Sequence, residues 1–309
     1  MGINPHFKLN KDKCISCGAC IKVCEGIMLE MDEENHPAIL GDEAWEARGC
    51  WGCQHCMAVC PVGAISVMDK DPADSTLPPK GNVAEMMDAL ILNRRSCRRY
   101  IQKAVDSETV EQMLRVMENA PTGGNRQSVE YTVVTDQDVM KQLRELTHIK
   151  LEELTAEGKY PFDFGKAFYD FLVESEKVVR PNDLVFCSAP NLFIAHQVSE
   201  PGSVWELDNL SDCSVADTYF ELLCAAHGLG AVLMSTPVGV LNMIPEAKKL
   251  IGIPEDHCIP MVVGFGYPEI KYPRSVQREG GTAIYRVTKD GIKVSGRIGG
   301  HYAEGEALD

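Results

Sequence analysis

Hydrophobic and polar residues alternate along most of this chain in patterns that predict both helices and strands. Apolar residues at helical spacing, preceded by residues that favour a helix cap, predict four main helices: 82–93, 106–120, one from about 136, and 208–227. Short apolar runs between turn residues predict three strands: 129–134, 190–196 and 258–266. Two further strands flanking Lys289, Asp290 and Gly291 predict a hairpin. This mixture predicts an α+β fold.

Residues 69–82 interrupt this pattern. The segment contains three prolines and a glycine, carries several aspartates and shows no apolar periodicity, which is typical of a linker. We therefore expect two domains, comprising residues 1–75 and 82–309.

The composition restricts the class of protein. Of the 309 residues, 45% are hydrophobic and 24% are charged, which is the balance of a soluble globular protein. No apolar run is long enough to span a membrane, and the first ten residues lack the apolar core of an export signal. The net charge of −15 disfavours nucleic acid as a partner, because an acidic surface repels phosphate. An odd number of cysteines, 13, argues against a disulfide framework and for metal or redox chemistry in the cytoplasm.

Eight of the cysteines form two runs with the same spacing, C-x2-C-x2-C-x3-C, and a proline follows the second run. In this pattern the first three thiolates of a run bind one iron–sulfur cubane, and the fourth binds the other. The spacing predicts two [4Fe–4S] clusters: cluster I bound by Cys14, Cys17, Cys20 and Cys60, and cluster II bound by Cys50, Cys53, Cys56 and Cys24. Paired zinc sites are the alternative, but zinc seldom uses an evenly spaced triplet with an offset fourth cysteine, given twice. Residues 5–68 resemble a bacterial two-cluster ferredoxin.

Two motifs in the second domain indicate a flat, anionic ligand. Residues 94–100, RRSCRRY, place four arginines within six positions, and guanidinium groups bind phosphate through paired hydrogen bonds. These arginines also follow a helix, whose C-terminal end favours cations, so the motif alone leaves both explanations open. Residues 120–127, APTGGNRQ, form a glycine-rich turn that exposes backbone amides and carbonyls, and Asn125 and Gln127 add polar side chains.

The combination of these motifs, about 25 residues apart, resembles the nitroreductase family of FMN-dependent enzymes. Residues 211–235 resemble the central dimer helix of that family and its following turn, and residues 264–278 resemble its C-terminal phosphate-binding segment. The resemblance spans about residues 85–290. It implies a nitroreductase-like FMN domain behind a small ferredoxin-like domain, and a homodimer in which each flavin lies at the subunit interface.

The resemblance also implies which residues bind FMN. Those expected at the ribityl phosphate and the pyrimidine side of the ring are Arg94, Arg95, Ser96 and Arg98. Those expected to approach the same flavin, several of them from the partner subunit, are Pro121, Thr122, Gly123, Asn125 and Gln127. Ser235, or backbone near it, is expected by the reactive edge of the ring, and Arg274, with Arg278 as the second choice, at the phosphate. No side chain is expected to act as a catalytic acid, because solvent or flavin can protonate the product.

Together the two resemblances imply a route for electrons. Clusters carry single electrons, and FMN accepts electrons singly and releases them in pairs. We expect an oxidoreductase that takes electrons from reduced ferredoxin or a similar donor and delivers them to a small electrophile: a nitroaromatic, a quinone or an activated alkene. Two alternatives stay open, namely a flavin-dependent dehydrogenase that delivers electrons to ferredoxin, and a non-enzymatic redox carrier or sensor.

Other features give weaker predictions. No G-x-G-x-x-G turn joins a strand to a helix, so the sequence gives no evidence for a tightly held NAD(P)H. Residues 160–171 contain six aromatic side chains, which predicts either a helix packed on the domain or a lid over the flavin. The histidines lack the spacing of metal ligands. The cysteines outside the clusters are expected to be buried free thiols: Cys97, Cys187, Cys213, Cys224 and Cys258.

Overall fold

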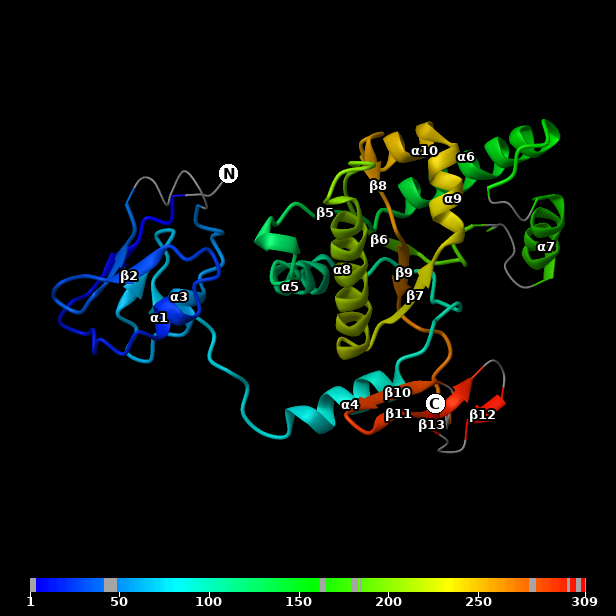
Figure 1. The fold of residues 1–309 in the computed structure, drawn as a ribbon. Helices are drawn as coiled ribbons and strands as arrows, with labels where there is room; N and C mark the ends of the chain where they lie inside the picture. The colour runs from blue at the N-terminus through cyan, green and yellow to red at the C-terminus, as the bar shows by residue number, and fades with distance from the viewer. Residues whose placement is uncertain are drawn as a thin grey trace.

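The computed structural model describes residues 4–41, 49–161, 165–178, 183, 185–277, 282–298, 301–303 and 307–308. Figure 1 shows a smaller N-terminal lobe and a larger C-terminal lobe, joined by an extended segment. The segment follows η1 (Pro72–Asp74) and leads into α4 (Val83–Asn93), which lies against the larger lobe. No helix among the described residues is long and apolar enough to cross a membrane.

Two small antiparallel sheets frame the N-terminal lobe. β1 (Lys8–Leu9) pairs with β4 (Ile65–Ser66), and β2 (Leu29–Met31) pairs with β3 (Pro37–Ile39). The apolar core cluster of this lobe has few buried members: Cys20, Leu29, Met57, Ile65 and Val67. A lobe with so small an apolar core is expected to depend on bound metal for much of its stability.

The two cysteine runs have the same local backbone. Each run leads into a one-turn helix, α1 (Ala19–Lys22) in the first and α3 (His55–Ala58) in the second. A residue with positive φ precedes each helix, Gly18 at 69° and Gln54 at 59°, which turns the chain sharply enough for neighbouring cysteines to converge.

The C-terminal lobe has an antiparallel sheet at its centre. Its strands lie in the order β5 (Glu130–Val134), β6 (Asn191–Val198), β9 (Val262–Gly266) and β7 (Gly230–Met234), and β8 (His257–Cys258) pairs with the end of β6. The two central strands are buried almost throughout, because helices cover both faces of the sheet. In this strand order, β5 and β7 form the two opposite edges of the sheet.

Helices cover the two faces of this sheet separately (Figure 1). On one face, α5 (Ser107–Met117) and α8 (Glu206–Ala226) pack against Phe193 and Phe265. On the other, α6 (Gln137–Ala156), α9 (Thr236–Met243) and α10 (Pro245–Leu250) pack against Leu192 and Val262. Neighbouring strand residues point to opposite faces, so the sheet separates two cores. α7 (Gly165–Val178) joins the second core through Leu172.

Three of the four predicted helix starts are confirmed, whereas α8 begins at Glu206, two residues before its predicted start, and has no side-chain cap. The side chain of Asn82 accepts a hydrogen bond from the backbone N–H of Glu85, and Asp106 accepts one from Thr109. Asp136 caps α6 in the same way. Each cap satisfies a backbone donor that the first turn of a helix leaves unpaired.

The strand predicted over residues 258–266 is wrong as a single element. It divides into β8 and β9, with residues 259–261 outside both. Pro260 lies in this gap, and proline has no N–H to continue a ladder. The predicted C-terminal hairpin is confirmed as β10 (Ile284–Thr288) and β11 (Gly291–Ile298), and β12 (His301–Ala303) and β13 (Ala307–Leu308) both pair with β11.

Candidate functional site

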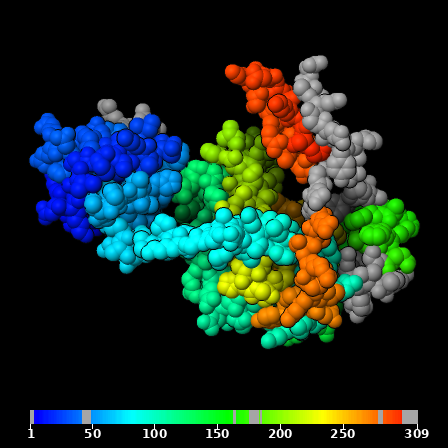
Figure 2. Space-filling view, turned by 90° about the horizontal axis from the view of Figure 1, so that it is seen from below, coloured from blue at the N-terminus to red at the C-terminus, as the bar shows by residue number. Residues whose placement is uncertain are grey.

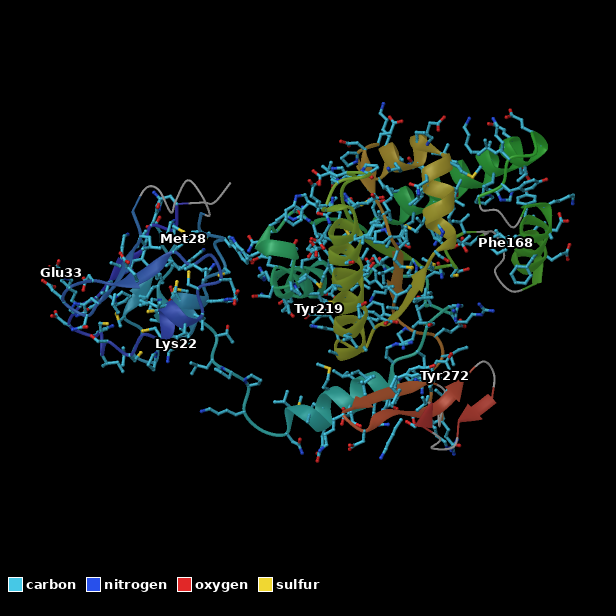
Figure 3. The ribbon with its side chains drawn as sticks, in the orientation of Figure 1. Lys22, Met28, Glu33, Phe168, Tyr219 and Tyr272 are labelled. Carbon is cyan, nitrogen blue, oxygen red and sulfur yellow. The ribbon has the colours of Figure 1, made fainter. Side chains whose placement is uncertain are left out.

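The cysteines of the two runs line two separate cavities in the N-terminal lobe, whose interior is rich in sulfur (Figure 3). The cysteines around one cavity are Cys14, Cys17, Cys20 and Cys60. Those around the other are Cys24, Cys50, Cys53 and Cys56. The structure thus brings together the same two sets that the spacing predicts, with the fourth cysteine of each run crossing to the other set.

Backbone amides approach the sulfurs of the first and the last cysteine of each run. The donors and their distances to Sγ are Ser16 to Cys14, 3.5 Å; Met28 to Cys24, 3.2 Å; Gly52 to Cys50, 3.4 Å; and Ala64 to Cys60, 3.2 Å. Such N–H groups help to set the reduction potential of a cluster. Burial raises the pKa of Cys56 to about 11, and a thiol of this kind loses its proton when metal coordinates it. The all-sulfur donor set therefore suits iron–sulfur clusters.

The arginine motif lines a cleft of about 640 Å³ at the C-terminal end of α8. Arg94 and Arg95 lie in its wall, together with Ala225 and Ala226 of α8 and Lys271 of the segment after β9. The side of α4 and the first residues of β7 complete the cleft. Its volume is in the range of sites that bind small molecules and cofactors, roughly 300–1,000 Å³.

Two close contacts fix the arginine motif beside β7. The Nε of Arg94 lies 3.2 Å from Oε1 of Glu221, a largely buried carboxylate on α8 whose pKa burial raises. Cys97 packs so closely on Gly230 that a Cβ there would lie 2.5 Å from the sulfur. Glycine at 230 is therefore required for the motif to approach the strand.

Buried, unpaired guanidinium nitrogens indicate that the cleft accepts an anion. The Nε and Nη2 atoms of Arg95 are buried and have no hydrogen-bond partner among the described residues. Leaving charged donors unpaired is unfavourable, and phosphate oxygens would satisfy both. This part of the cleft fits the phosphate of FMN.

The glycine-rich turn is held at the other end of α8. The backbone N–H of Gly123 donates to both carboxylate oxygens of Asp212, at 3.1 Å each. The guanidinium of Arg126 donates to Oδ1 of Asn209 at 2.7 Å and lies 4.5 Å from the ring centroid of Trp205. A Cβ at Gly123 would lie 2.9 Å from a carboxylate oxygen of Asp208, so glycine permits this close packing.

The same turn contacts the N-terminal lobe. The Nδ2 of Asn125 donates to the carbonyl oxygen of Trp51 at 2.8 Å. Trp51 directly follows Cys50, and both residues line the cavity assigned to cluster II. Figure 2 shows the two lobes touching in this region, away from the linker.

The remaining predicted flavin residues are more scattered. Ser96 bridges Ala231 of β7, and Arg98 is exposed and donates to the carbonyl of Ser96. Ser235 is exposed at the start of α9. Arg274 is exposed and does not line the cleft, and Arg278 lies outside the described residues.

The structure therefore does not bring all predicted flavin residues together in one chain. The turn contacts Asp212, and the cleft is lined by Ala225. At roughly 1.5 Å per residue, these two positions are about 20 Å apart along α8. The turn also precedes β5, whereas the arginine motif borders β7, and three strand spacings add about 14 Å across the sheet. A flavin bound in the cleft is consequently far from residues 120–127 of its own chain.

The sequence did not predict two charged groups at this site, Lys271 in the cleft and Glu221 beside Arg94. Lys271 lines the cleft together with Tyr272, which Figure 3 shows near α4 and β10. The available signal was that Lys271 is a basic residue within the predicted phosphate-binding segment, residues 264–278. Glu221 gives no signal, because its position in an apolar helix does not reveal its partner, Arg94.

Two other predictions have clear outcomes. Cys97 is buried, as expected, and burial raises the pKa of its thiol, which disfavours the reactive thiolate. α7 packs on the domain: Leu172 is buried, and Phe168, which Figure 3 shows on α7, contacts the same core. Phe162 and Phe164, two of the six aromatic residues considered for a lid, lie outside the described residues.

Comparison with known proteins agrees with both assignments. Residues 91–267 match the model of the nitroreductase family, and residues 13–64 match that of a 4Fe-4S dicluster domain. A putative NADH dehydrogenase/NAD(P)H nitroreductase from Archaeoglobus fulgidus is 27% identical over 58% of this chain and 84% of its own length. An iodotyrosine deiodinase from Drosophila melanogaster is 24% identical over 61% of this chain and 64% of its own length. A ferredoxin from Pyrobaculum islandicum is 43% identical over 19% of this chain and 49% of its own length.

Solved structures are similar at a lower level. A nitroreductase with bound FMN from Desulfitobacterium hafniense is 19% identical, with a TM-score of 0.49, over 62% of this chain and 94% of its own. One from Bacteroides fragilis, also with bound FMN, is 20% identical, with a TM-score of 0.48, over 66% of this chain and 99% of its own. Because the family match covers more than half of the chain, this protein belongs to the nitroreductase family of FMN-dependent oxidoreductases, and it carries an N-terminal 4Fe-4S dicluster ferredoxin domain.

Proposed function

We propose that this protein is an iron–sulfur flavoprotein that passes electrons from reduced ferredoxin, or a similar low-potential donor, through two [4Fe–4S] clusters to FMN. The final acceptor is an electrophilic small molecule, namely a nitroaromatic, a quinone or an activated alkene. The observation that carries the proposal is the 2.8 Å hydrogen bond from Asn125 to Trp51, since it joins the glycine-rich turn to the residue beside a cluster II ligand.

FMN, when bound, converts single electrons into a two-electron reduction. Arg95 and Lys271 would hold its phosphate, because their cationic groups line the cleft and two nitrogens of Arg95 lack partners. Arg98 would stabilise the negative charge that reduction places on the pyrimidine side of the ring. Covalent linkage of donor and acceptor domains raises the effective concentration of reduced cluster at the flavin.

The proposal includes a homodimer with two FMN and four clusters. Its support is the distance between the arginine cleft and residues 120–127 within one chain, because a second copy can supply the missing half of each site. The domain limits 1–75 and 82–309 and a cytoplasmic location belong to the same proposal. They rest on the linker composition and on thiol chemistry that needs a reducing compartment.

The test begins with anaerobic purification of the full chain, followed by assays of iron, sulfide and flavin. We expect about eight iron atoms and one FMN per chain. Turnover is then measured with nitroaromatics, quinones and activated alkenes, using reduced ferredoxin, NADH or NADPH as the donor. We expect ferredoxin to support turnover and the nicotinamides to support little.

Direction of electron flow is tested on the same preparation. Rapid reduction of added oxidised ferredoxin by a reduced substrate, with no turnover in the opposite direction, would identify a dehydrogenase and contradict the proposal. A colourless anaerobic preparation, without flavin or iron, would contradict it at the level of the cofactors.

A further inference from the structure

Within one chain, cluster II and the arginine cleft lie at opposite ends of α8. Cluster II is beside residues 120–127, because the carbonyl of Trp51 accepts the hydrogen bond from Asn125. Those residues are fixed to the first half of α8 through Asp212. The cleft is fixed to the last turns of α8 through Glu221 and Ala225. Figure 1 shows the same arrangement, with the N-terminal lobe beside α5 and with α4 at the far end of α8.

This arrangement opposes electron transfer within one chain. A flavin held by Arg95 is separated from cluster II by about 20 Å of α8 in one direction and about 14 Å of sheet in another. Electron tunnelling through protein slows steeply with distance. The cluster is instead placed for a flavin that approaches Asn125 from outside the chain.

Uncovered apolar surface lies on α8 and on α4. On α8 itself, Leu207 is 76% exposed, and the exposed Leu210 lies on the same side of the helix as the small, exposed residues Ser211 and Ser214. None of the residues of α4 is buried, although its sequence, VAEMMDALILN, is largely apolar. Surfaces of this kind are rarely left in water and indicate a protein interface.

A second copy of this chain is the occupant that fits. In a two-fold dimer the same patch pairs with itself, so α8 of one protomer packs antiparallel to α8 of the other. The start of each α8 then lies beside the end of the other. This places residues 120–127 and the attached cluster II next to the partner's arginine cleft.

We propose that electrons cross the dimer interface: cluster II of one protomer reduces the FMN held by the arginine cleft of the other. The inference rests on the proposed function, since it assumes that clusters feed FMN. External ferredoxin is the reductant, and each transfer oxidises a reduced cluster by one electron. Two transfers and one proton from solvent yield the two-electron-reduced FMN anion.

Heterodimers with differently tagged protomers distinguish the routes. The cluster lesion is Cys53→Ala with Cys56→Ala, and the flavin lesion is Arg95→Ala with Arg98→Ala. In the first heterodimer each protomer carries one lesion; in the second, one protomer carries both lesions and the other is wild type. The measured quantity is the amplitude of FMN reduction by reduced ferredoxin in the absence of substrate.

The two heterodimers give opposite results for the two routes. Transfer across the interface predicts ferredoxin-driven reduction of the flavin in the first heterodimer and none in the second. Transfer within a chain predicts the reverse. The proposal is overturned whenever the first heterodimer does not exceed the second, including the case in which neither is reduced. Wild-type homodimer serves as the separate test of the proposed function, because its flavin must be reduced whichever route holds.

A flavin-free measurement tests the placement directly. A photo-crosslinking amino acid replaces Trp51 in apo-protein assembled from isotopically light and heavy protomers, and the linked peptides are identified by mass spectrometry. We expect links to the 94–100 or 230–236 segment that join light to heavy peptides. Links to these segments only between peptides of one isotopic form, or no links to them at all, overturn the proposal even if the wild-type enzyme is active.

Discussion

The two halves of this molecule solve the problem of holding a redox group in different ways. In the N-terminal lobe each predicted cluster has all four cysteines in one chain and around one cavity. In the C-terminal lobe the predicted flavin residues divide between the two ends of α8. A cubane is small enough for a short loop and one distant cysteine to enclose it. FMN is longer and contacts more protein, so its site can be shared between subunits.

The largest effect on electron transfer is expected from a substitution in the N-terminal lobe, whose cluster sites are each complete in one chain. Cys53→Ala should lower ferredoxin-driven reduction of FMN by about 100-fold, since the tethered donor is lost. FMN content should stay the same, because the cleft is in the other lobe. Stopped-flow absorbance and flavin analysis measure the two quantities.

The control is Cys258→Ser, a half-buried thiol that lines neither cluster cavity. It should keep both the rate and the flavin. If Cys53→Ala retains the wild-type rate of flavin reduction, cluster II is not on the route.

A smaller effect, on FMN affinity, is expected from a substitution in the C-terminal lobe, whose predicted flavin residues are divided between the two ends of α8. Arg95→Ala should weaken FMN binding by about 10- to 100-fold, which corresponds to one or two charge-assisted hydrogen bonds to phosphate. Arg115→Ala, which removes an exposed guanidinium on α5, is the matched control. Fluorescence titration of apo-protein with FMN gives both dissociation constants. Equal constants for wild type and Arg95→Ala would remove Arg95 from the phosphate site.

A third effect is expected on folding of the C-terminal lobe. Gly230→Ala should destabilise it by about 1–3 kcal/mol, because the added Cβ would overlap the sulfur and Cβ of Cys97. Denaturant unfolding of the flavin-free protein measures the change. Gly252→Ala is a useful contrast, since no atom lies near its Cβ position but φ is 76°, which alanine adopts poorly. In the double variant with Cys97→Ala the Gly230 penalty should become smaller; an unchanged penalty would show that the contact is not its cause.

The smallest effect concerns pH. Burial, followed by the neighbouring His257, lowers the pKa of His196 to about 4. In the unfolded chain His196 therefore binds a proton near pH 6.5, whereas in the folded chain it stays unprotonated at that pH. The folded state consequently loses stability as pH falls. From pH 7 to 5.5 the loss attributable to this group is about 1 kcal/mol.

The comparison needed is the difference between wild type and His196→Gln at both pH values, because buried carboxyls such as Asp217, whose pKa is raised, act in the opposite direction. The variant should lose about 1 kcal/mol less than wild type over this interval. An identical pH dependence in the two proteins would show that His196 is protonated as easily folded as unfolded.

Local signals in the sequence predict local features. The caps at Asn82, Asp106 and Asp136 appear where expected, because the capping residue and the backbone N–H that donates to its side chain lie within three positions. The two cysteine sets can also be predicted from the sequence, because the motif contains both the triplets and the fourth cysteine that crosses to the other set.

Features that depend on tertiary contacts cannot be predicted from local sequence patterns. His196 and His257 are 61 residues apart, yet their Nδ1 atoms lie 2.8 Å from each other. The scatter of Ser235, Arg274 and the arginine cleft depends on how strands are ordered in the sheet. The contact between Asn125 and Trp51 depends on how the two lobes dock. No spacing along the chain encodes any of these.

The most direct test of the account is the order in which the chromophores are reduced. Anaerobic, oxidised full-length protein is mixed rapidly with reduced two-cluster ferredoxin, and the cluster and flavin absorbances are followed separately without substrate. If the clusters feed the flavin, the clusters bleach first and the flavin follows at a rate independent of ferredoxin concentration. Flavin that is reduced before the clusters, at a rate proportional to ferredoxin, would contradict the account.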